Sequence, residues 1–344
     1  MTSDTQAHTL IENSVRELVD VTPATVAEDM LRGNQPVVFR GLVKDWPVVQ
    51  AATQSYERFH EYLKALSVNS LVNVSTADKS PTGYVSYNEN LTGLTAKIAR
   101  MPFDQMLDLL SAEQGRPNSS LVYMGSTTAD TCLPAFRQEN DLPVPSDHPL
   151  VSLWLGTQTR IPAHYDLPDN LACVAAGKRR FILFPPEQVE NLYVGPLDYT
   201  PAGQSVSMVD FHAIDFDRFP KFKTALDHAV ITELDAGDAI FIPSMWWHHI
   251  EGLAPYNLLV NYWWRQSPAY MGPPQAALEH ALLSLRDLPP AQKQAWKTLF
   301  DHYVFDHKAE NFNHIPEEKQ GIIGPHDDQS ARRLRAAVLQ KLNR

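Results

Sequence analysis

The chain has 344 residues, 44% of them hydrophobic, and a formal net charge of −11, which suits a globular protein with one large or two ordinary domains. The acidic balance gives no general attraction to phosphate backbones, so nucleic acid is a disfavoured partner. No apolar stretch approaches the length of a membrane span, and no secretory signal is visible. With Cys132 and Cys173 lacking metal-site spacing, we expect a reduced, soluble, cytoplasmic protein.

The first third of the chain predicts a mixture of helices and strands. Thr22 and Pro23 have the character of an N-cap and a first helical residue, and Gly33 that of a helix stop, which predicts a helix from Pro23 to Arg32. Further helices are expected over 55–66 and 101–112, and strands over 36–40, 68–75 and 83–87. We expect this α/β region, residues 1–115, to pack on the domain that follows.

From about Ser119 the pattern changes to short apolar or alternating runs separated by turn residues. Strands are expected over 121–124, 151–156, 171–176, 180–184, 229–234, 238–243 and 257–264. Many short strands without intervening helices indicate a β-sandwich or barrel. The irregular stretch 193–222 is too long for a plain connection and is typical of a lid or binding loop.

After Pro273 the pattern becomes helical to the end of the chain. One apolar stripe contains Leu278, Leu282 and Leu285, and a bulkier one contains Trp296, Leu299, Phe300, Tyr303 and Val304. Such stripes pack on the neighbouring domain in most proteins, whereas an exposed stripe marks association. The helical region, residues 269–344, is therefore expected either to cover the barrel or to form a homodimer interface.

A possible metal site stands in the strand-rich region. His164 and Asp166 are separated by one residue on an extended segment, so both side chains point to the same face. A distant histidine, either His248 or His249, could complete a 2-His-1-carboxylate triad; the two are neighbours on a strand and point to opposite faces. This ligand set leaves open positions on the metal and is typical of non-haem Fe(II) oxygenases.

Several ordered motifs carry a resemblance to a known family. They are Ala163-His164-Tyr165-Asp166; Gly177-Lys178-Arg179-Arg180 followed by Leu183-Phe184-Pro185-Pro186; and Gly237-Asp238 with Ile242-Pro243 and 246–251. Over roughly 119–264 the chain resembles the JmjC/cupin-like 2-oxoglutarate oxygenases, in particular the group of the factor-inhibiting-HIF asparaginyl hydroxylase and the tRNA wybutosine hydroxylase. The resemblance implies a mainly β fold, a double-stranded β-helix (jelly roll) over 116–268, with helical flanks.

The resemblance also implies a ligand set. The spacing of the second cupin motif selects His248 as the third metal ligand beside His164 and Asp166, and His249 then faces away. The co-substrate 2-oxoglutarate would meet Arg179, with Lys178 and Arg180 facing outward as solvated charges. Further residues that match the family's co-substrate site are Tyr123, Asn170, Asn261 and Trp263. Relatives usually have lysine in place of Arg179, and Ile161 replaces a threonine, so this pocket differs from that of the asparaginyl hydroxylase.

The function that these matches imply is hydroxylation of a C–H bond with Fe(II), 2-oxoglutarate and O2, releasing succinate and CO2. A protein or peptide side chain is the expected substrate. In the loop 196–222, Ser205 and Val206 replace an Arg-Gln pair that holds the target in the asparaginyl hydroxylase. A small-molecule substrate, a metal-dependent cupin enzyme that does not use 2-oxoglutarate, and a non-catalytic binding module are the alternatives.

Overall fold

The computed structural model describes residues 6–26, 31–77, 83–88, 90–116, 119–198, 200 and 203–343. The chain forms two compact units, Met1–Gln266 and Ser267–Arg344. Among the described residues, no helix combines the length and the hydrophobicity needed to cross a bilayer.

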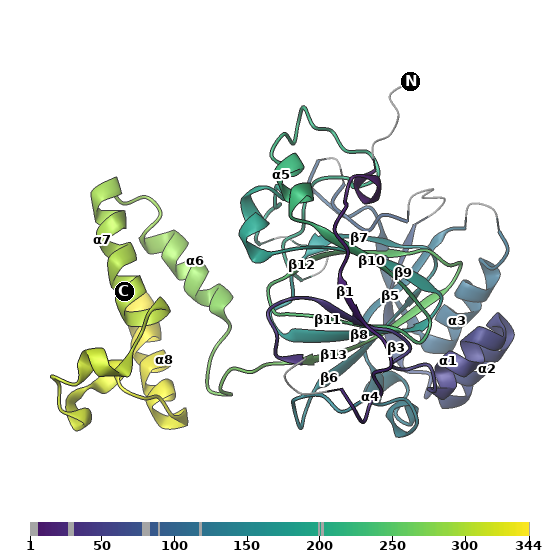
Figure 1. The fold of residues 1–344 in the computed structure, drawn as a ribbon, viewed down its shortest axis with the longest axis horizontal. Helices are drawn as coiled ribbons and strands as arrows, with labels where there is room; N and C mark the ends of the chain where they lie inside the picture. Colours follow the sequence, from purple (N-terminus) through teal and green to yellow (C-terminus); the bar gives the residue numbers. More distant parts are fainter. Residues whose placement is uncertain are drawn as a thin grey trace. The chain divides into compact units, whose positions relative to one another are not determined.

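The first unit contains a nine-stranded and a four-stranded sheet, which lie one above the other in Figure 1. The larger sheet has the order β1-β2-β11-β8-β13-β6-β5-β3-β4, and the smaller has the order β10-β9-β12-β7. The strands are β1 Arg16–Leu18, β2 Val37–Phe39, β3 Leu71–Ala77, β4 Lys97–Pro102, β5 Leu121–Thr128, β6 Leu150–Gly156, β7 Arg160–His164, β8 Asp169–Ala176, β9 Lys178–Phe184, β10 Val230–Asp235, β11 Ala239–Ile242, β12 Trp247–Gly252 and β13 Asn257–Trp264.

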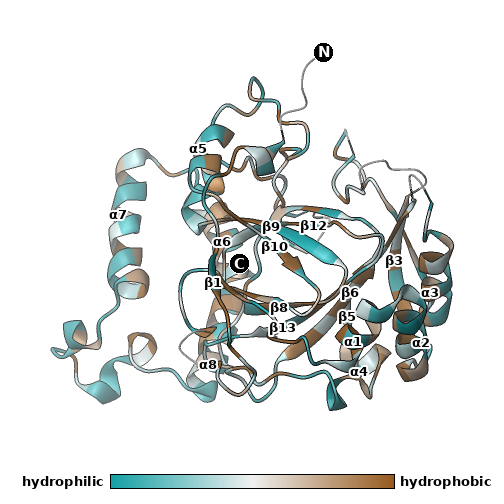
Figure 2. Ribbon diagram, turned by 45° about the vertical axis from the view of Figure 1, so that its right-hand side comes forward, coloured by the Kyte–Doolittle hydropathy of each residue, from teal (hydrophilic) through white to brown (hydrophobic). Residues whose placement is uncertain are grey.

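The eight strands from β6 to β13 form a jelly roll. They contribute β11-β8-β13-β6 to the larger sheet and β10-β9-β12-β7 to the smaller one, through antiparallel pairs. This arrangement is the double-stranded β-helix, and it confirms the mainly β fold that the motifs predict. Figure 2 shows β9, β10 and β12 facing β8 and β13 across the interior.

Alternation along the strands divides the core into two layers. On β8, Leu171, Cys173 and Ala175 belong to a cluster with the helices of the first unit, whereas Ala172 and Val174 pack with residues of β9 and β11 between the sheets. All β8 residues are buried because both faces of this strand are covered. The helices of this unit are α1 Pro47–Gln54, α2 Tyr56–Leu66, α3 Phe103–Ala112, α4 Ala129–Cys132 and α5 Phe222–Asp227. Both cysteines are buried free thiols.

The N-terminal third departs from the predicted elements in five places. The described part of the helix expected from Pro23 to Arg32 is a turn, and residues 27–30 lie outside the described residues. The strand expected at 83–87 is reduced to isolated bridges, while β1, β4 and α1 were not predicted. The hydrogen bonds of a short strand such as β1 are made to a neighbour that is distant in sequence, so local sequence gives it little signal.

The second unit is helical, as predicted. Its helices are α6 Pro274–Ser284, α7 Pro290–Phe300, continued by a π-helical turn Asp301–Phe305, and α8 Asp328–Leu342. Asp327 and Ser330 form a capping box at the start of α8. None of the residues of α6 or α7 is fully buried within the described chain.

The turn between β8 and β9 depends on a glycine. Gly177 has φ +77°, and a Cβ there would lie 2.3 Å from the Tyr256 carbonyl oxygen. Gly177→Ala is expected to lower the free energy of unfolding by at least about 2 kcal/mol in urea titration, because it adds a steric clash to the cost of a left-handed backbone.

The matched control is Gly115→Ala. Gly115 has φ +72° but no atom within 4 Å of the added Cβ. This substitution should cost only about 1 kcal/mol, the backbone part alone. Equal losses for the two variants would contradict the steric argument.

Candidate metal centre

The three predicted metal ligands come together at the open end of β7 and β12. His164 is the last residue of β7 and pairs directly with His248 of β12. Their rings lie 4.4 Å apart between centroids, and His248 Nε2 is 3.6 Å from Asp166 Oδ2. One potential ligand atom from each of the three side chains lies within 4.8 Å of the others. Among the described residues, this is the one His/Cys/Asp/Glu group with such geometry.

Backbone hydrogen bonds orient both histidines. His164 Nδ1 donates to the Pro162 carbonyl and His248 Nδ1 to the Trp246 carbonyl, each over 2.9 Å. Because a carbonyl oxygen only accepts, Nδ1 carries the proton in both rings. Nε2 is then the free lone pair that can bind a cation.

Burial favours the metal-binding form of His248. Desolvation first, and then the neighbouring His164, lowers the pKa of His248 from 6.5 to about 4. The ring is therefore neutral at pH 7, and a neutral imidazole binds a metal without first releasing a proton.

Two asparagines connect the carboxylate ligand to the centre of the larger sheet. Asn170 Nδ2 donates to Asp166 Oδ2 over 3.3 Å, and Asn261 Nδ2 donates to Asn170 Oδ1 over 2.8 Å. Asn261 Oδ1 is buried and accepts no hydrogen bond from the described residues. Asn170 thus contacts a candidate metal ligand, and the buried oxygen of Asn261 has no donor among the described residues.

A buried cation lies in the same cavity. Arg179 is 2% exposed, and its guanidinium donates only to the Trp154 carbonyl, over 3.2 Å, among the described residues. Its Nε atom has no partner there, and it forms no ion pair with a described side chain. Desolvation lowers the pKa of Arg179 to about 10, so the group is still charged at pH 7. Charged groups almost never remain buried without an anionic partner.

One cavity of about 290 Å³ is lined by both the candidate metal ligands and Arg179. It is lined by the three candidate metal ligands and by Asn170, Asn261, Arg179, Tyr123, Trp154, Trp263 and Ile161, together with Asn73 and Ser75 of β3, Ile98 of β4, and Val85, Gly125, Ser126, Ile250 and Leu259. The Tyr123 ring stacks on Trp154 at 6.3 Å, and burial raises the pKa of the Tyr123 hydroxyl, which stays protonated as a hydrogen-bond donor.

The three residues predicted to face away from the cavity do so, but the environment predicted for one of them is wrong. His249 points to the opposite side of β12, where it stacks on Phe211 at 4.4 Å. Lys178 and Arg180 also face outward. Arg180 is not a solvated charge, however, because its largely buried guanidinium binds Glu233 and Glu251.

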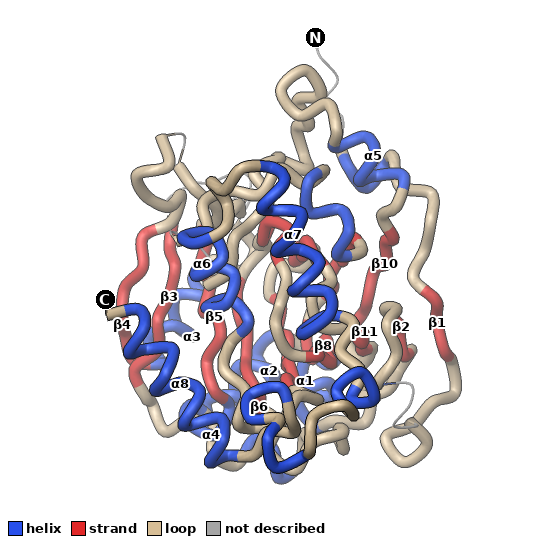
Figure 3. Tube along the Cα trace, turned by 90° about the vertical axis from the view of Figure 1, so that its left-hand side faces the viewer, coloured by secondary structure: helices blue, strands red, loops and turns tan. Residues whose placement is uncertain are grey.

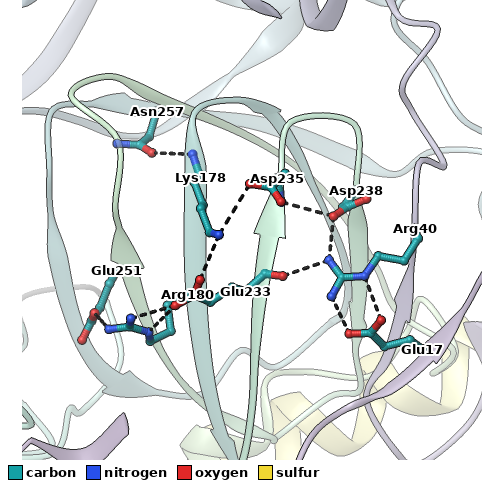
Figure 4. A network of polar contacts seen from close by, with 9 residues as sticks. All are labelled: Glu17, Arg40, Lys178, Arg180, Glu233, Asp235, Asp238, Glu251 and Asn257. Carbon is teal, nitrogen blue, oxygen red and sulfur yellow. Dashed lines mark hydrogen bonds and ion pairs between the residues drawn. The ribbon is translucent and has the colours of Figure 1, made fainter. Parts of the chain in front are cut away.

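The polar network on that outer face was not anticipated from the sequence. Figure 4 shows Arg180 between Glu233 and Glu251, Lys178 directed at Glu233 and Asp235, and Arg40 joining Glu17 and Asp238. The Glu251 carboxylate also accepts from His212 Nε2 over 2.7 Å and from His249 Nε2 over 3.0 Å. Since its members come from distant segments, no local motif could reveal it.

A jelly roll with two histidines and one carboxylate at its open end defines a cupin-type fold with a candidate metal centre. A family model described as "Cupin-like domain" matches residues 23–270, and the chain belongs to this family. The predicted resemblance is thereby confirmed.

Sequence identity to individual curated proteins agrees with this family assignment. The chain is 27% identical to JmjC domain-containing protein D of Dictyostelium discoideum over 248 residues, which cover 66% of this chain and 51% of that one. It is 24% identical over 270 residues to the human bifunctional peptidase and (3S)-lysyl hydroxylase JMJD7, covering 71% and 81%. It is also 33% identical over 106 residues to the zebrafish tRNA wybutosine-synthesizing protein 5, covering 31% and 29%. The chain spans about half or less of the length of several curated relatives.

Glu251 should make stability depend on pH. Burial would raise its pKa, but the hydrogen bonds from His212 and His249 outweigh burial and hold the pKa well below its ordinary 4.5. A depressed carboxylate pKa stabilises the fold above about pH 4.5, and the contribution is lost as the pH falls further. Glu251→Gln is therefore expected to lower the free energy of unfolding by about 3 kcal/mol at pH 7.

Urea titrations at pH 7 and pH 3 test this expectation. The difference between wild type and Glu251→Gln should shrink at pH 3, since the wild-type carboxylate loses its advantage. Glu233→Gln is the matched control. Because Glu233 is partly exposed, this substitution should lower the free energy of unfolding by less than about 1 kcal/mol. A difference in unfolding free energy between wild type and Glu251→Gln that does not change with pH would contradict the lowered pKa of Glu251.

Proposed function

We propose that the chain is an Fe(II)- and 2-oxoglutarate-dependent oxygenase that hydroxylates a C–H bond of a protein or peptide side chain. The observation that carries the proposal is that one cavity contains both a three-residue candidate metal site and a buried arginine that forms no ion pair among the described residues. An Fe(II) ion supplies O2 activation coupled to oxidative decarboxylation of 2-oxoglutarate to succinate and CO2. The donor set of two neutral imidazoles and one carboxylate fits this metal.

Each residue then has a defined task. His164, Asp166 and His248 hold the metal, and Asn170 fixes the Asp166 carboxylate by its hydrogen bond. Arg179 neutralises the far carboxylate of 2-oxoglutarate, with Tyr123 as a second donor. A guanidinium offers a planar pair of donors that matches a carboxylate. Asn261 and Trp263, with the hydrophobic walls Ile161 and Leu259, orient the co-substrate and exclude water from the cavity.

Three other functions compete with this one. A metal-dependent cupin enzyme without 2-oxoglutarate would have no use for a buried cation facing the metal, and neither would a non-catalytic binding module. A small-molecule hydroxylase would use the same chemistry. Relatives whose names record action on protein, such as the human (3S)-lysyl hydroxylase, favour a protein or peptide substrate.

Anaerobic loading tests the metal and co-substrate sites together. Addition of Fe(II) and then 2-oxoglutarate to the wild type should produce a metal-to-ligand charge-transfer absorption band. His164→Ala should abolish the band, because one ligand is lost. Arg179→Ala should retain it but need a roughly 10- to 100-fold higher 2-oxoglutarate concentration, the cost of one charge-assisted carboxylate contact.

The control is Arg180→Ala, which removes a neighbouring guanidinium on the opposite face of β9. Its band should titrate as in the wild type if the protein is folded by circular dichroism. The absence of a band in the wild type, together with no succinate formed in air, would contradict the proposed function.

We also propose that the 269–344 region mediates a homodimer. Its support is the exposure of Trp296, Leu299, Val304 and Phe305 on α7 and the π-helical turn, within the described chain. Sedimentation velocity should show a dimer for the wild type and a monomer for Trp296→Glu/Phe305→Glu; a wild-type monomer would contradict it. We propose a cytoplasmic location, since buried free thiols suit a reducing compartment. We also propose that residues 1–115 form a region that packs on the 116–268 core.

A further inference from the structure

The nine-stranded sheet ends at β4, next to the mouth of the cavity. Figure 3 shows β4 outside β3 at one border of the strands. Residues 97–100 are exposed, and Ile98 has 61% of its surface accessible. Ile98 is also part of the cavity lining. The edge strand is therefore continuous with the candidate active site.

The register shows which main-chain groups of β4 are free. Phe103 N donates to the carbonyl of Ser70, which lies directly opposite it, so this is a hydrogen-bonded pair of the antiparallel ladder. Because such pairs alternate with non-bonded ones, Met101, Ala99 and Lys97 bond to β3. Ile98, Arg100 and Pro102 direct their main-chain groups away from it. Pro102 fits this pattern, since it has no N–H to donate.

The free main-chain groups remain unpaired among the described residues. No backbone hydrogen bond joins 97–101 to a described residue outside the β3 ladder. An open row of N–H and C=O groups is a template for an added strand. The N–H and C=O groups of Ile98 and Arg100 are thus available to an extended peptide.

The side chains of the same two residues face the cavity side of the sheet. Ile98 lies opposite Ser75 and Arg100 lies opposite Asn73, and both β3 residues line the cavity. Arg100 is exposed and forms no ion pair with a described residue. On a chain of net charge −11, this is a cation left free beside the site. Lys97 is also exposed but points to the other face by alternation.

We infer that β4 is the substrate-docking edge: an extended peptide pairs with the main chain of Ile98 and Arg100, and an acidic side chain two residues from the target residue binds Arg100. This inference rests on the proposed function and names its substrate class. The two-residue offset follows from period-two alternation, which puts the target and the acidic residue on the same face. An acidic residue one position from the target faces away from Arg100.

Hydrogen exchange tests the docking without requiring turnover. The probes are two pools of synthetic peptides with a degenerate centre and one aspartate placed two residues, or one residue, from it. With Mn(II) and 2-oxoglutarate loaded on the full chain, the two-residue pool should slow exchange of the Ile98 and Arg100 amides. The amides of Lys97 and Ala99, which already bond to β3, should change little. No slowing at Ile98 and Arg100 with either pool would overturn the inference.

Turnover with Fe(II), 2-oxoglutarate and air tests whether the charge of Arg100 selects the peptide. The two-residue pool should be hydroxylated roughly fivefold faster than the one-residue pool, as judged by mass spectrometry. Arg100→Glu should transfer the preference to peptides with lysine at that offset. Lys97→Glu, which makes the same charge change on the opposite face, should leave the preference unchanged. Equal rates for both pools in the wild type would overturn the role of Arg100.

A proline tests the main-chain contact. Ile98→Pro removes an N–H that β3 does not use, so the sheet should remain intact, whereas Ile98→Ala removes only the side chain. Ile98→Pro should weaken peptide binding by roughly fivefold beyond Ile98→Ala, the loss of one hydrogen bond. Equal binding by the two variants would overturn pairing at the edge.

The docking inference and the proposed function can fail separately. Slowed exchange at Ile98 and Arg100 with no hydroxylated peptide would support docking and contradict peptide hydroxylation. Hydroxylation without a preference and without slowed exchange would support the function and overturn the docking edge.

Discussion

The organisation of the site depends on one electrostatic constraint: a guanidinium inside a jelly roll must have an anion. Arg179 is buried, and the described residues offer it a single carbonyl. Desolvating a cation costs several kcal/mol, which is recovered only through a paired charge. The partner therefore has to come from a ligand, and the same cavity is lined by the candidate metal ligands His164, Asp166 and His248. A dicarboxylate that chelates a metal at one end satisfies both requirements.

Strand alternation explains how one short segment serves two purposes. The Gly177 turn starts β9 so that Arg179 points between the sheets while Lys178 and Arg180 point outward. The outward residues enter a network with Glu233 and Glu251, and that network also binds His249, the neighbour of the candidate metal ligand His248. A shift of register by one residue would exchange the two sets. Arg179 would leave the cavity, and Lys178 and Arg180 would turn inward, away from Glu233 and Glu251.

A β-sandwich or barrel and the His164-x-Asp166 pair could be predicted from local signals, because most of the strands are short, apolar and separated by turns and the pair depends only on period-two alternation. The jelly roll itself followed from the resemblance to a family, and β7 and β12 were not among the expected strands. The choice of His248 over His249 needed the spacing of a family motif, since alternation alone allows either residue. The choice of Arg179 likewise needed the family's cation position two residues after Gly177, and alternation then placed Lys178 and Arg180 on the outer face.

Other features depend on contacts between distant segments and gave no local signal. Strands β1 and β4 are short and mostly exposed, and each is held by its neighbour in the sheet. Asn73 and Ser75 line the cavity only because β3 pairs with β5 at the end of the larger sheet. The bond from His212 to Glu251 joins a long loop to β12. The helix expected from Pro23 had favourable end signals, but its described part is a turn, so capping residues alone did not determine the structure.

The central claim is that a metal and a dicarboxylate share this cavity. The most direct measurement is a crystal structure of the full chain grown with Mn(II) and 2-oxoglutarate, with the metal located by anomalous scattering. The account predicts an anomalous peak between His164, Asp166 and His248, with 2-oxoglutarate extending from the metal to the guanidinium of Arg179. A metal bound elsewhere, or a carboxylate that leaves Arg179 without a partner, would contradict it.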